Sequence, residues 1–234
     1  MKSALIPFAI HKPTSRWVDV TQVQRGLNCD CICPSCFGDL IAKQGDNQEW
    51  HFAHRQTETE CEERYSFGES LYGLTMQLLN QLNSQTVPYA SLFESRILAT
   101  QAIELNIDFD GYAVDFVVYT EDTQIAVLLT HGLRPFRGEL LALIPDTYPI
   151  LEIQLDEYHY EFRNSTPDQY RQLLLELLTE SLTAKRWRRI PEKCKFAGRE
   201  QFTYHCMGCN KRWQSHAHAH MCEACQSPLL SLRE

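Results

Sequence analysis

The spacing of apolar residues changes from a helical to a strand period within the first half of the chain. Leucines recur at steps of three and four residues between Leu71 and Leu82, which predicts an amphipathic helix over about residues 65 to 83. Pro88 follows soon after and opposes its continuation. Residues 102 to 110 then alternate between apolar and polar side chains, which predicts a strand with one buried face.

Three further apolar segments, separated by turn signals, predict more strands. They cover residues 112–119, 125–130 and 148–155, and residues 137–144 between the last two predict a short helix stopped by Pro145. The resulting order is a helix, three strands in a meander, a short helix and a strand. This order predicts an α+β fold in which a mixed sheet carries helices on its faces.

The last predicted helix has the clearest start signal. Thr166 supplies a capping hydroxyl, Pro167 the first helical position, and Gln169 the capping-box amide. The apolar stripe that follows predicts a helix running to about Ile190. The basic segment 185–189 would then lie at the carboxyl end of this helix, where cations interact favourably with the helix dipole.

Composition and hydropathy restrict the class of protein. The chain is 44% hydrophobic and 22% charged, which is typical of a globular protein and excludes disordered, collagen-like and coiled-coil chains. No apolar run reaches the roughly 18 to 20 residues that a membrane-spanning helix needs. We therefore expect a soluble, cytoplasmic protein with no membrane partner.

Charge is distributed unevenly. The net charge is −8, but residues 184–234 hold ten Lys and Arg against four Asp and Glu, a net of +6, which leaves −14 for residues 1–183. Phosphate contacts are therefore expected from the basic tail, unless residues 185–189 form only a solvated helix end. The candidate nucleic-acid-binding residues are Lys185, Arg186, Arg188, Arg189, Lys211, Arg212 and Trp213.

Ten cysteines in a chain expected to stay in a reducing compartment indicate metal ligands rather than disulfides. Two paired motifs near the carboxyl end predict a closed zinc ribbon with four thiolate ligands. These ligands are Cys206, Cys209, Cys222 and Cys225. Two disulfides or unrelated core cysteines are the alternatives. The alternating His216, His218 and His220 offer a substitute ligand, or form a solvated hairpin.

A second zinc site of two cysteines and two histidines is predicted near the amino terminus. Its ligands are Cys33, Cys36, His51 and His54, the histidines returning after a hairpin-like stretch. Cys61 could replace His51, and Cys29 or Cys31 could replace a thiolate of the pair. The histidines could also be polar positions of a core strand. Neither cluster shows an open coordination position, so structural zinc is favoured over catalytic zinc.

One acid stands out in the middle of the chain. Asp115 lies in an otherwise apolar strand, where a carboxylate is costly to bury unless it is paired, hydrogen-bonded or bound to a metal. With the amino-terminal motifs, this acid makes the chain resemble the competence protein CoiA-like family over residues 28 to 156. The matching segments are Cys33-Pro-Ser-Cys36, Trp50-His51-Phe52-Ala53-His54, Cys61, Glu69-Ser70, Asp115, Thr130-His131 and Leu151-Glu152-Ile153.

The resemblance implies a zinc finger joined to a PD-(D/E)XK nuclease-like core. In such a core an Asp and a Glu on adjacent strands hold Mg²⁺ for phosphodiester hydrolysis, and a Lys two positions after the Glu orients the attacking water. Asp115 takes the first position, but the next strand offers Ala126 and Leu128 where the family pattern has the acid and the Lys. Glu152 and the helix-borne Glu69 remain as candidate catalytic acids.

These observations favour three parts: a zinc-finger region at 1–64, a nuclease-like core at 65–190, and a zinc ribbon at 191–234. We expect a subunit with a degenerate core that binds nucleic acid, DNA rather than RNA, or acts in assembly with a protein partner. One alternative is an active Mg²⁺-dependent nuclease using Asp115, Glu152 and Glu69. Another is a protein-interaction scaffold without nucleic-acid contact, which the acidic body favours.

Overall fold

The fold was analysed in a computed structural model of the chain. The structure describes residues 5–45, 50–55, 61–81, 89–90, 97–98, 100–109, 112–120, 123–179, 181, 183–189, 202–206, 212–215 and 231–233. Spatial contacts divide the chain into two compact units, Met1–Ile190 and Pro191–Glu234. The finer division into three parts stays a prediction.

The amino-terminal module of the first unit is built from short strands. Strands β1 (Ala9–His11), β2 (Arg16–Val18) and β3 (Cys31–Ile32) form a sheet in the order β2-β1-β3. Strands β4 (Leu40–Lys43) and β5 (His51–His54) form an antiparallel pair, as the expected hairpin requires. Two 3-10 turns, η1 (Val20–Gln22) and η2 (Leu27–Cys29), lie between β2 and β3 in the chain.

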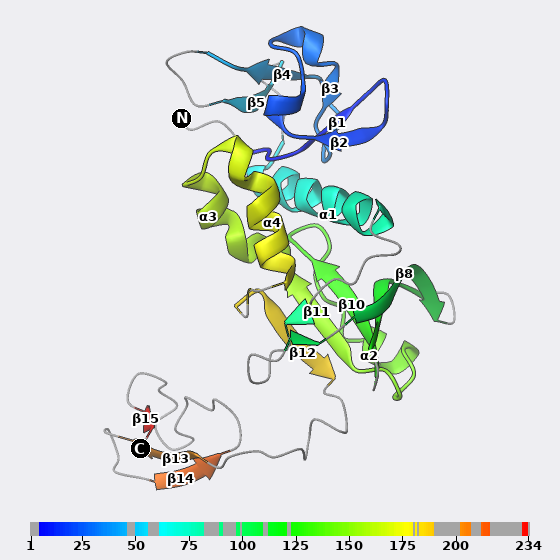
Figure 1. The fold of residues 1–234 in the computed structure, drawn as a ribbon, viewed down its shortest axis with the longest axis vertical. Coiled ribbons are helices and arrows are strands. Elements are labelled where there is room, and N and C mark those ends of the chain that lie inside the picture. The colour runs from blue at the N-terminus through cyan, green and yellow to red at the C-terminus, as the bar shows by residue number, and fades with distance from the viewer. Residues whose placement is uncertain are drawn as a thin grey trace. The chain divides into compact units, whose positions relative to one another are not determined.

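A five-stranded mixed sheet forms the centre of the first unit (Figure 1). Its order is β12-β11-β10-β9-β8, and only β10 and β11 run parallel among neighbours. The strands are β8 (Thr100–Phe109), β9 (Tyr112–Thr120), β10 (Gln124–Thr130), β11 (Ile150–Gln154) and β12 (Lys185–Arg189). A separate two-stranded pair joins β6 (Tyr89–Ala90) to β7 (Ile97–Leu98).

Helices cover this sheet, as the sequence pattern predicts for an α+β fold. The first helix, the strand meander, the short second helix and the following strand appear in the expected order. The helical elements are α1 (Glu63–Gln81), α2 (Leu140–Leu143), η3 (Leu155–Tyr158), α3 (His159–Arg163), η4 (Pro167–Gln169) and α4 (Tyr170–Thr179). The predicted capping box is present, since the Gln169 side chain accepts a hydrogen bond of 3.1 Å from the Thr166 N–H.

Strand β10 shows how the core is divided between the two faces of the sheet. Ile125, Val127 and Leu129 pack with buried residues of α1 and α4, whereas Ala126 and Leu128 pack with residues of α2. Successive side chains of a strand point to opposite faces, so a continuous apolar run is needed where both faces are covered. The apolar sequence of β10 therefore reflects its central position.

The prediction of one long helix to Ile190 is wrong. Helix α4 ends at Thr179, and residues 185–189 form β12, which pairs with β11. Lys185 is buried on this strand while Arg186 is exposed. Pairing with β11 supplies backbone hydrogen bonds between the two strands. This tertiary contribution outweighs the helical propensity of the segment.

The amino-terminal module packs on the helices of the core. The Gln77 side chain of α1 accepts a hydrogen bond of 2.9 Å from the Trp17 N–H and donates one of 3.2 Å to the Trp17 carbonyl. A Cβ added at Gly73 would lie 1.8 Å from the Trp17 ring, so only glycine allows this approach. Arg171 of α4 also forms an ion pair with the nearly buried Asp19 at 3.4 Å. The module and the core are therefore joined through α1 and α4.

The second unit contains one small antiparallel sheet among its described residues. Its order is β14-β13-β15, from β13 (Phe202–Cys206), β14 (Arg212–Ser215) and β15 (Ser231–Arg233). Cys206 ends β13, but Cys209, Cys222 and Cys225 lie outside the described residues. The zinc ribbon therefore stays a prediction.

Candidate metal centre and buried acidic residues

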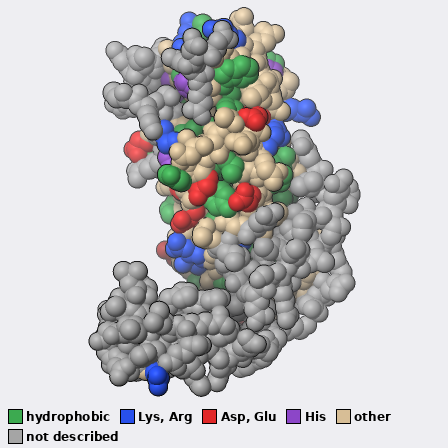
Figure 2. All heavy atoms as spheres, turned by 60° about the vertical axis from the view of Figure 1, so that its left-hand side comes forward, with side chains coloured by type: hydrophobic (Ala, Val, Ile, Leu, Met, Phe, Trp, Pro, Cys, Tyr) green, Lys and Arg blue, Asp and Glu red, His purple; other side chains and the backbone are tan. Residues whose placement is uncertain are grey.

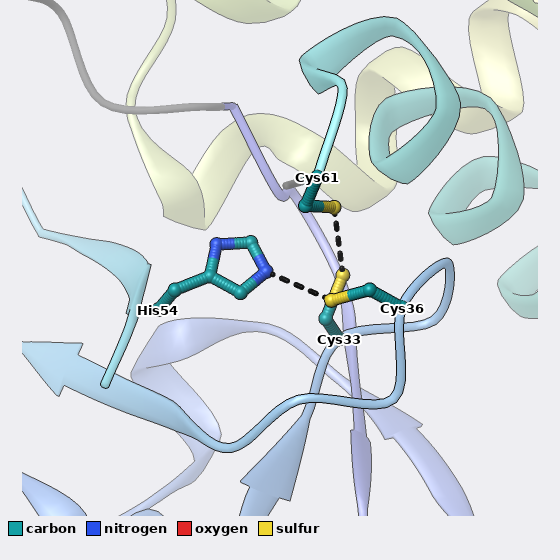
Figure 3. Close-up of side chains that lie close together, drawn as sticks. All are labelled: Cys33, Cys36, His54 and Cys61. Atoms are coloured by element: carbon teal, nitrogen blue, oxygen red, sulfur yellow. Dashed lines mark hydrogen bonds between the residues drawn. The ribbon is translucent and has the colours of Figure 1, made fainter. Parts of the chain in front are cut away.

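Four potential metal ligands converge in the amino-terminal module (Figure 3). The ligand atoms of Cys33, Cys36, His54 and Cys61 all lie within 4.8 Å of one another. The Cys33 and Cys61 sulfurs are 3.7 Å apart, and the Cys36 sulfur lies 3.3 Å from His54 Nε2. Thiolates about 2.3 Å from a tetrahedral zinc would stand at about this separation. The donor set and its spacing therefore fit one zinc ion.

The four ligands come from three local structures. Cys33 and Cys36 belong to a turn between β3 and β4, which is closed by a hydrogen bond of 2.9 Å from the Cys33 N–H to the Gly38 carbonyl. His54 is the last residue of β5, and Cys61 comes two residues before α1 begins at Glu63. A bound metal would thus join the turn, the hairpin and the start of the first core helix.

The expected ligand set is corrected at one position, because the cluster contains Cys61 in place of His51. His51 and His54 are three residues apart on one strand, and such residues point to opposite faces. His51 is paired across the hairpin with Lys43, whereas His54 is paired with Leu40. Predicting a strand for this segment would have been enough to place the two imidazoles on opposite faces. Cys61 was the alternative that the sequence left open.

Cys29 and Cys31 do not take part in the cluster. Both are buried in the hydrophobic core of the amino-terminal module. The Cys29 thiol donates to the Leu40 carbonyl at 3.3 Å, and the Cys31 thiol donates to the Cys29 carbonyl at 3.1 Å. Their role in the described structure is therefore packing.

Burial affects the protonation of the candidate ligands. It raises the pKa of the Cys33 thiol to about 12, raises the pKa of Cys61, and lowers the pKa of His54. His54 is therefore neutral and can donate a nitrogen lone pair, whereas the thiols must lose protons to bind a cation. Zinc uptake is accordingly expected to release protons.

Asp115 is a buried acid, and protein donors contact both of its carboxylate oxygens. Its Oδ1 lies 2.7 Å from an Arg134 guanidinium nitrogen and accepts a hydrogen bond of 3.0 Å from the Tyr72 hydroxyl. Its Oδ2 accepts from the Leu129 N–H at 2.8 Å. Burial raises the pKa of Asp115, while Arg134, the Leu129 N–H and Tyr72 oppose that rise. A cation already balances this carboxyl group.

Glu152 is held in the same manner on β11. Its Oε2 accepts from Arg188 Nε at 2.7 Å and lies 2.6 Å from Arg188 Nη2, so one carboxylate oxygen faces two guanidinium nitrogens. Its Oε1 accepts from the Thr130 hydroxyl at 2.7 Å. The Glu152 side chain is 1% exposed, as is that of Asp115, and β10 lies between their strands. Both acids are therefore buried and paired with arginine.

Glu69, the third candidate catalytic acid, lies next to His131. Its Oε1 lies 3.7 Å from His131 Nε2, and burial raises the pKa of Glu69. The His131 side chain is 1% exposed, and among the described residues neither ring nitrogen has a hydrogen-bond partner. Asp115, Glu152 and Glu69 do not form a potential metal cluster in the described part of the chain, where only the cysteine and histidine group does.

The basic residues of β12 are largely occupied by protein contacts. Lys185 is 3% exposed and donates to the Thr179 carbonyl at 2.9 Å, and Arg189 donates to the carbonyls of Ile144 and Pro145 at 2.9 and 2.8 Å. Arg186 is 52% exposed and pairs with Glu157 at 3.4 Å. In the second unit Arg212 is exposed, while Lys211 and the Trp213 side chain lie outside the described part.

The free energy of unfolding is expected to decrease as the pH falls below 7, and the protonation of His131 contributes to this decrease. Burial and the nearby Arg134 lower its pKa from 6.5 to about 4, so the unfolded chain takes up a proton there that the folded chain does not. Between these values the contribution changes by at most about 1.4 kcal/mol per pH unit. Urea unfolding of the protein and His131→Gln at about pH 7 and about pH 5 should show a smaller loss in the variant. Equal losses would contradict the lowered pKa.

Comparison with known proteins supports one part of the resemblance. Residues 19–63 match the model of the competence protein CoiA, N-terminal domain. That range includes all four residues of the cysteine and histidine cluster. No curated protein and no solved structure matches the chain. Within the described residues, no helix is long and apolar enough to cross a membrane.

Proposed function

We propose that this chain, whose residues 19–63 resemble the CoiA amino-terminal domain, is a zinc-containing subunit that binds nucleic acid or acts in assembly. Its core would be nuclease-like but without a working metal site. One observation carries this proposal: the two strand-borne acids, Asp115 and Glu152, are each paired with a guanidinium group. DNA is the preferred nucleic acid.

The guanidinium pairs oppose the alternative of an active nuclease. Mg²⁺ needs several oxygen ligands at about 2.1 Å and usually keeps some of its water. Arg134 and Arg188 lie against the carboxylates, at 2.7 and 2.6 Å, in the places where a cation would bind. A metal would have to displace both arginines and leave their charges unpaired. The two arginines therefore neutralise the carboxylate charges that Mg²⁺ would neutralise in an active nuclease.

The proposed zinc ion has a structural role. Three thiolates and an imidazole complete a tetrahedral set without a position for substrate or water. The ion would connect the turn at Cys33 and Cys36 to the residue that leads into α1, the helix that carries Tyr72 and Gln77. Through that helix it would keep the amino-terminal module in place on the core.

Binding and cleavage assays with zinc-loaded protein test this proposal. Single- and double-stranded DNA and RNA are each offered with Mg²⁺ or Mn²⁺ present or absent, without a chelator that would remove zinc. We expect salt-dependent binding, stronger for DNA, and no cleavage. Asp115→Asn serves as the matched variant with a nearly unchanged side-chain volume.

Two results would contradict the proposal in different directions. Metal-dependent cleavage that disappears in Asp115→Asn would identify an active nuclease and direct attention to Glu69 and Glu152. Absence of binding to every nucleic acid near physiological salt would instead favour the protein-interaction scaffold.

A further inference from the structure

An aromatic residue follows the second cysteine of the metal-binding turn in an unfavourable backbone conformation. Phe37 has a φ of +58°, in the left-handed region that a Cβ atom disfavours and that is unusual for a bulky side chain. The residue lies in a hydrogen-bonded turn, in which the Phe37 N–H donates to the Cys33 carbonyl at 3.0 Å. Glycine is the residue that suits such a position, and the chain has one immediately afterwards, at Gly38.

Packing does not account for the choice of phenylalanine. Phe37 is 67% exposed, although the turn that carries it is held by hydrogen bonds and leads to the buried Cys33. A strained residue persists when the surrounding structure imposes it, and such residues gather at binding and catalytic sites. The phenyl ring is thus presented to solvent from a rigid base.

Two cations contact the chain close to the turn that carries Phe37. Two residues after Phe37, Asp39 forms ion pairs with Lys12 at 3.1 Å and with Arg55 at 3.9 Å. All three side chains are about half exposed, and the set has two cations for one anion. On the face shown in Figure 2, Lys and Arg side chains lie at the top and others lie lower down, around the Asp and Glu side chains of the middle.

We propose that Phe37 is a stacking platform for an unpaired base of a single-stranded nucleic acid, with Lys12 and Arg55 contacting its backbone phosphates. This inference rests on the proposed function and adds a contact surface to it. Aromatic rings flanked by cations suit single strands, whose bases expose their faces, while a duplex keeps those faces stacked. The rigid turn also lowers the entropy lost on binding.

Binding and stability measured together test this assignment. Zinc-loaded full-length protein, Phe37→Gly and Phe37→Asn are titrated with a labelled mixed-sequence single-stranded DNA and with an abasic strand of equal length. Glycine and asparagine both tolerate the left-handed conformation, so the turn should be preserved. We expect each variant to bind the ordinary strand about tenfold more weakly and the abasic strand as the unchanged protein does.

The thermal midpoint and the zinc content show whether Phe37 serves in binding or in the packing of the fold. Both are expected to stay unchanged in Phe37→Gly, or the midpoint to rise, because the left-handed strain is relieved. Tyr160→Ala is the matched control, since Tyr160 is also an exposed aromatic residue, 75% exposed, on α3. Its removal should leave binding unchanged.

Each contrary result has a separate meaning. If the unchanged protein binds single strands and Phe37→Gly binds equally well, the stacking platform is wrong while the proposed function stands. A lower thermal midpoint in both Phe37 variants, or equal losses on the abasic strand, would also overturn stacking at Phe37. If the unchanged protein binds no nucleic acid, this inference and the proposed binding function fail together.

Discussion

Replacing Cys61 with serine should remove one zinc equivalent per chain and lower the thermal stability of the first unit. The sulfur of Cys61 is one of four ligands that converge within 4.8 Å, and it stands two residues before α1. Structural zinc contributes about 10 to 16 kcal/mol to folding in small zinc-finger peptides near neutral pH. Here the surrounding core retains part of the structure, so we expect partial unfolding that begins in the amino-terminal module.

His51→Ala is the matched control for this result. His51 was among the ligands predicted from sequence, but it lies outside the cluster and is paired across the hairpin with Lys43. Its removal should leave the zinc content unchanged, as measured by metal analysis of protein purified without chelator. Loss of zinc in His51→Ala together with its retention in Cys61→Ser would mean that the ligand set has been assigned incorrectly.

Arg188→Ala should destabilise the first unit by up to about 3 kcal/mol, because it leaves the buried Glu152 carboxylate without its partly exposed cation, whose side chain is 32% exposed. Glu152 is 1% exposed, and Arg188 contacts it through two nitrogens at 2.6 and 2.7 Å. The free energy of unfolding in urea measures this loss. The double variant Arg188→Met with Glu152→Gln should recover much of the stability, since it removes both charges and keeps most of the side-chain volume.

Arg186→Ala offers a control on the same strand. Arg186 and its partner Glu157 are 52% and 41% exposed, and exposed pairs of this kind contribute up to about 1 kcal/mol. If Arg186→Ala and Arg188→Ala lower the free energy of unfolding by comparable amounts, the stabilising pair of Arg188 and Glu152 is contradicted. Glu152 would then be a possible metal ligand. The contrast also separates stability from nucleic-acid binding within one basic segment, because only Arg186 can be changed with little effect on folding.

Much of the core could be predicted because its signals are local. Strict alternation in β8 and the leucine spacing in α1 follow from burying one face of each element, and the Thr166 capping box depends on neighbouring residues alone. The turn containing Cys33 and Cys36 is equally local. The order of elements, and with it the mixed α+β architecture, could therefore be derived without coordinates.

Predictions that depended on distant partners were less successful. The segment 185–189 has helix-compatible residues, but β11 offers it backbone hydrogen bonds that the isolated segment lacks. Arg134 lies in a turn without any recognisable sequence motif. The backbone hydrogen bonds of this turn join Arg134 to His131, and the ion pair that its side chain forms with Asp115 is visible only in the folded structure. Sequence periodicity does not predict contacts of this kind between distant residues.

Local sequence thus sufficed for the first helix, the start of the last one, the central strands, the paired cysteines and the unusual acid at Asp115. Tertiary structure alone assigned Cys61 to the metal cluster, placed β12 at the sheet edge and supplied Arg134 and Arg188 to the buried acids. The reason is physical: amphipathic periods and caps arise within one element, whereas ligand convergence and charge pairing depend on where separate elements pack.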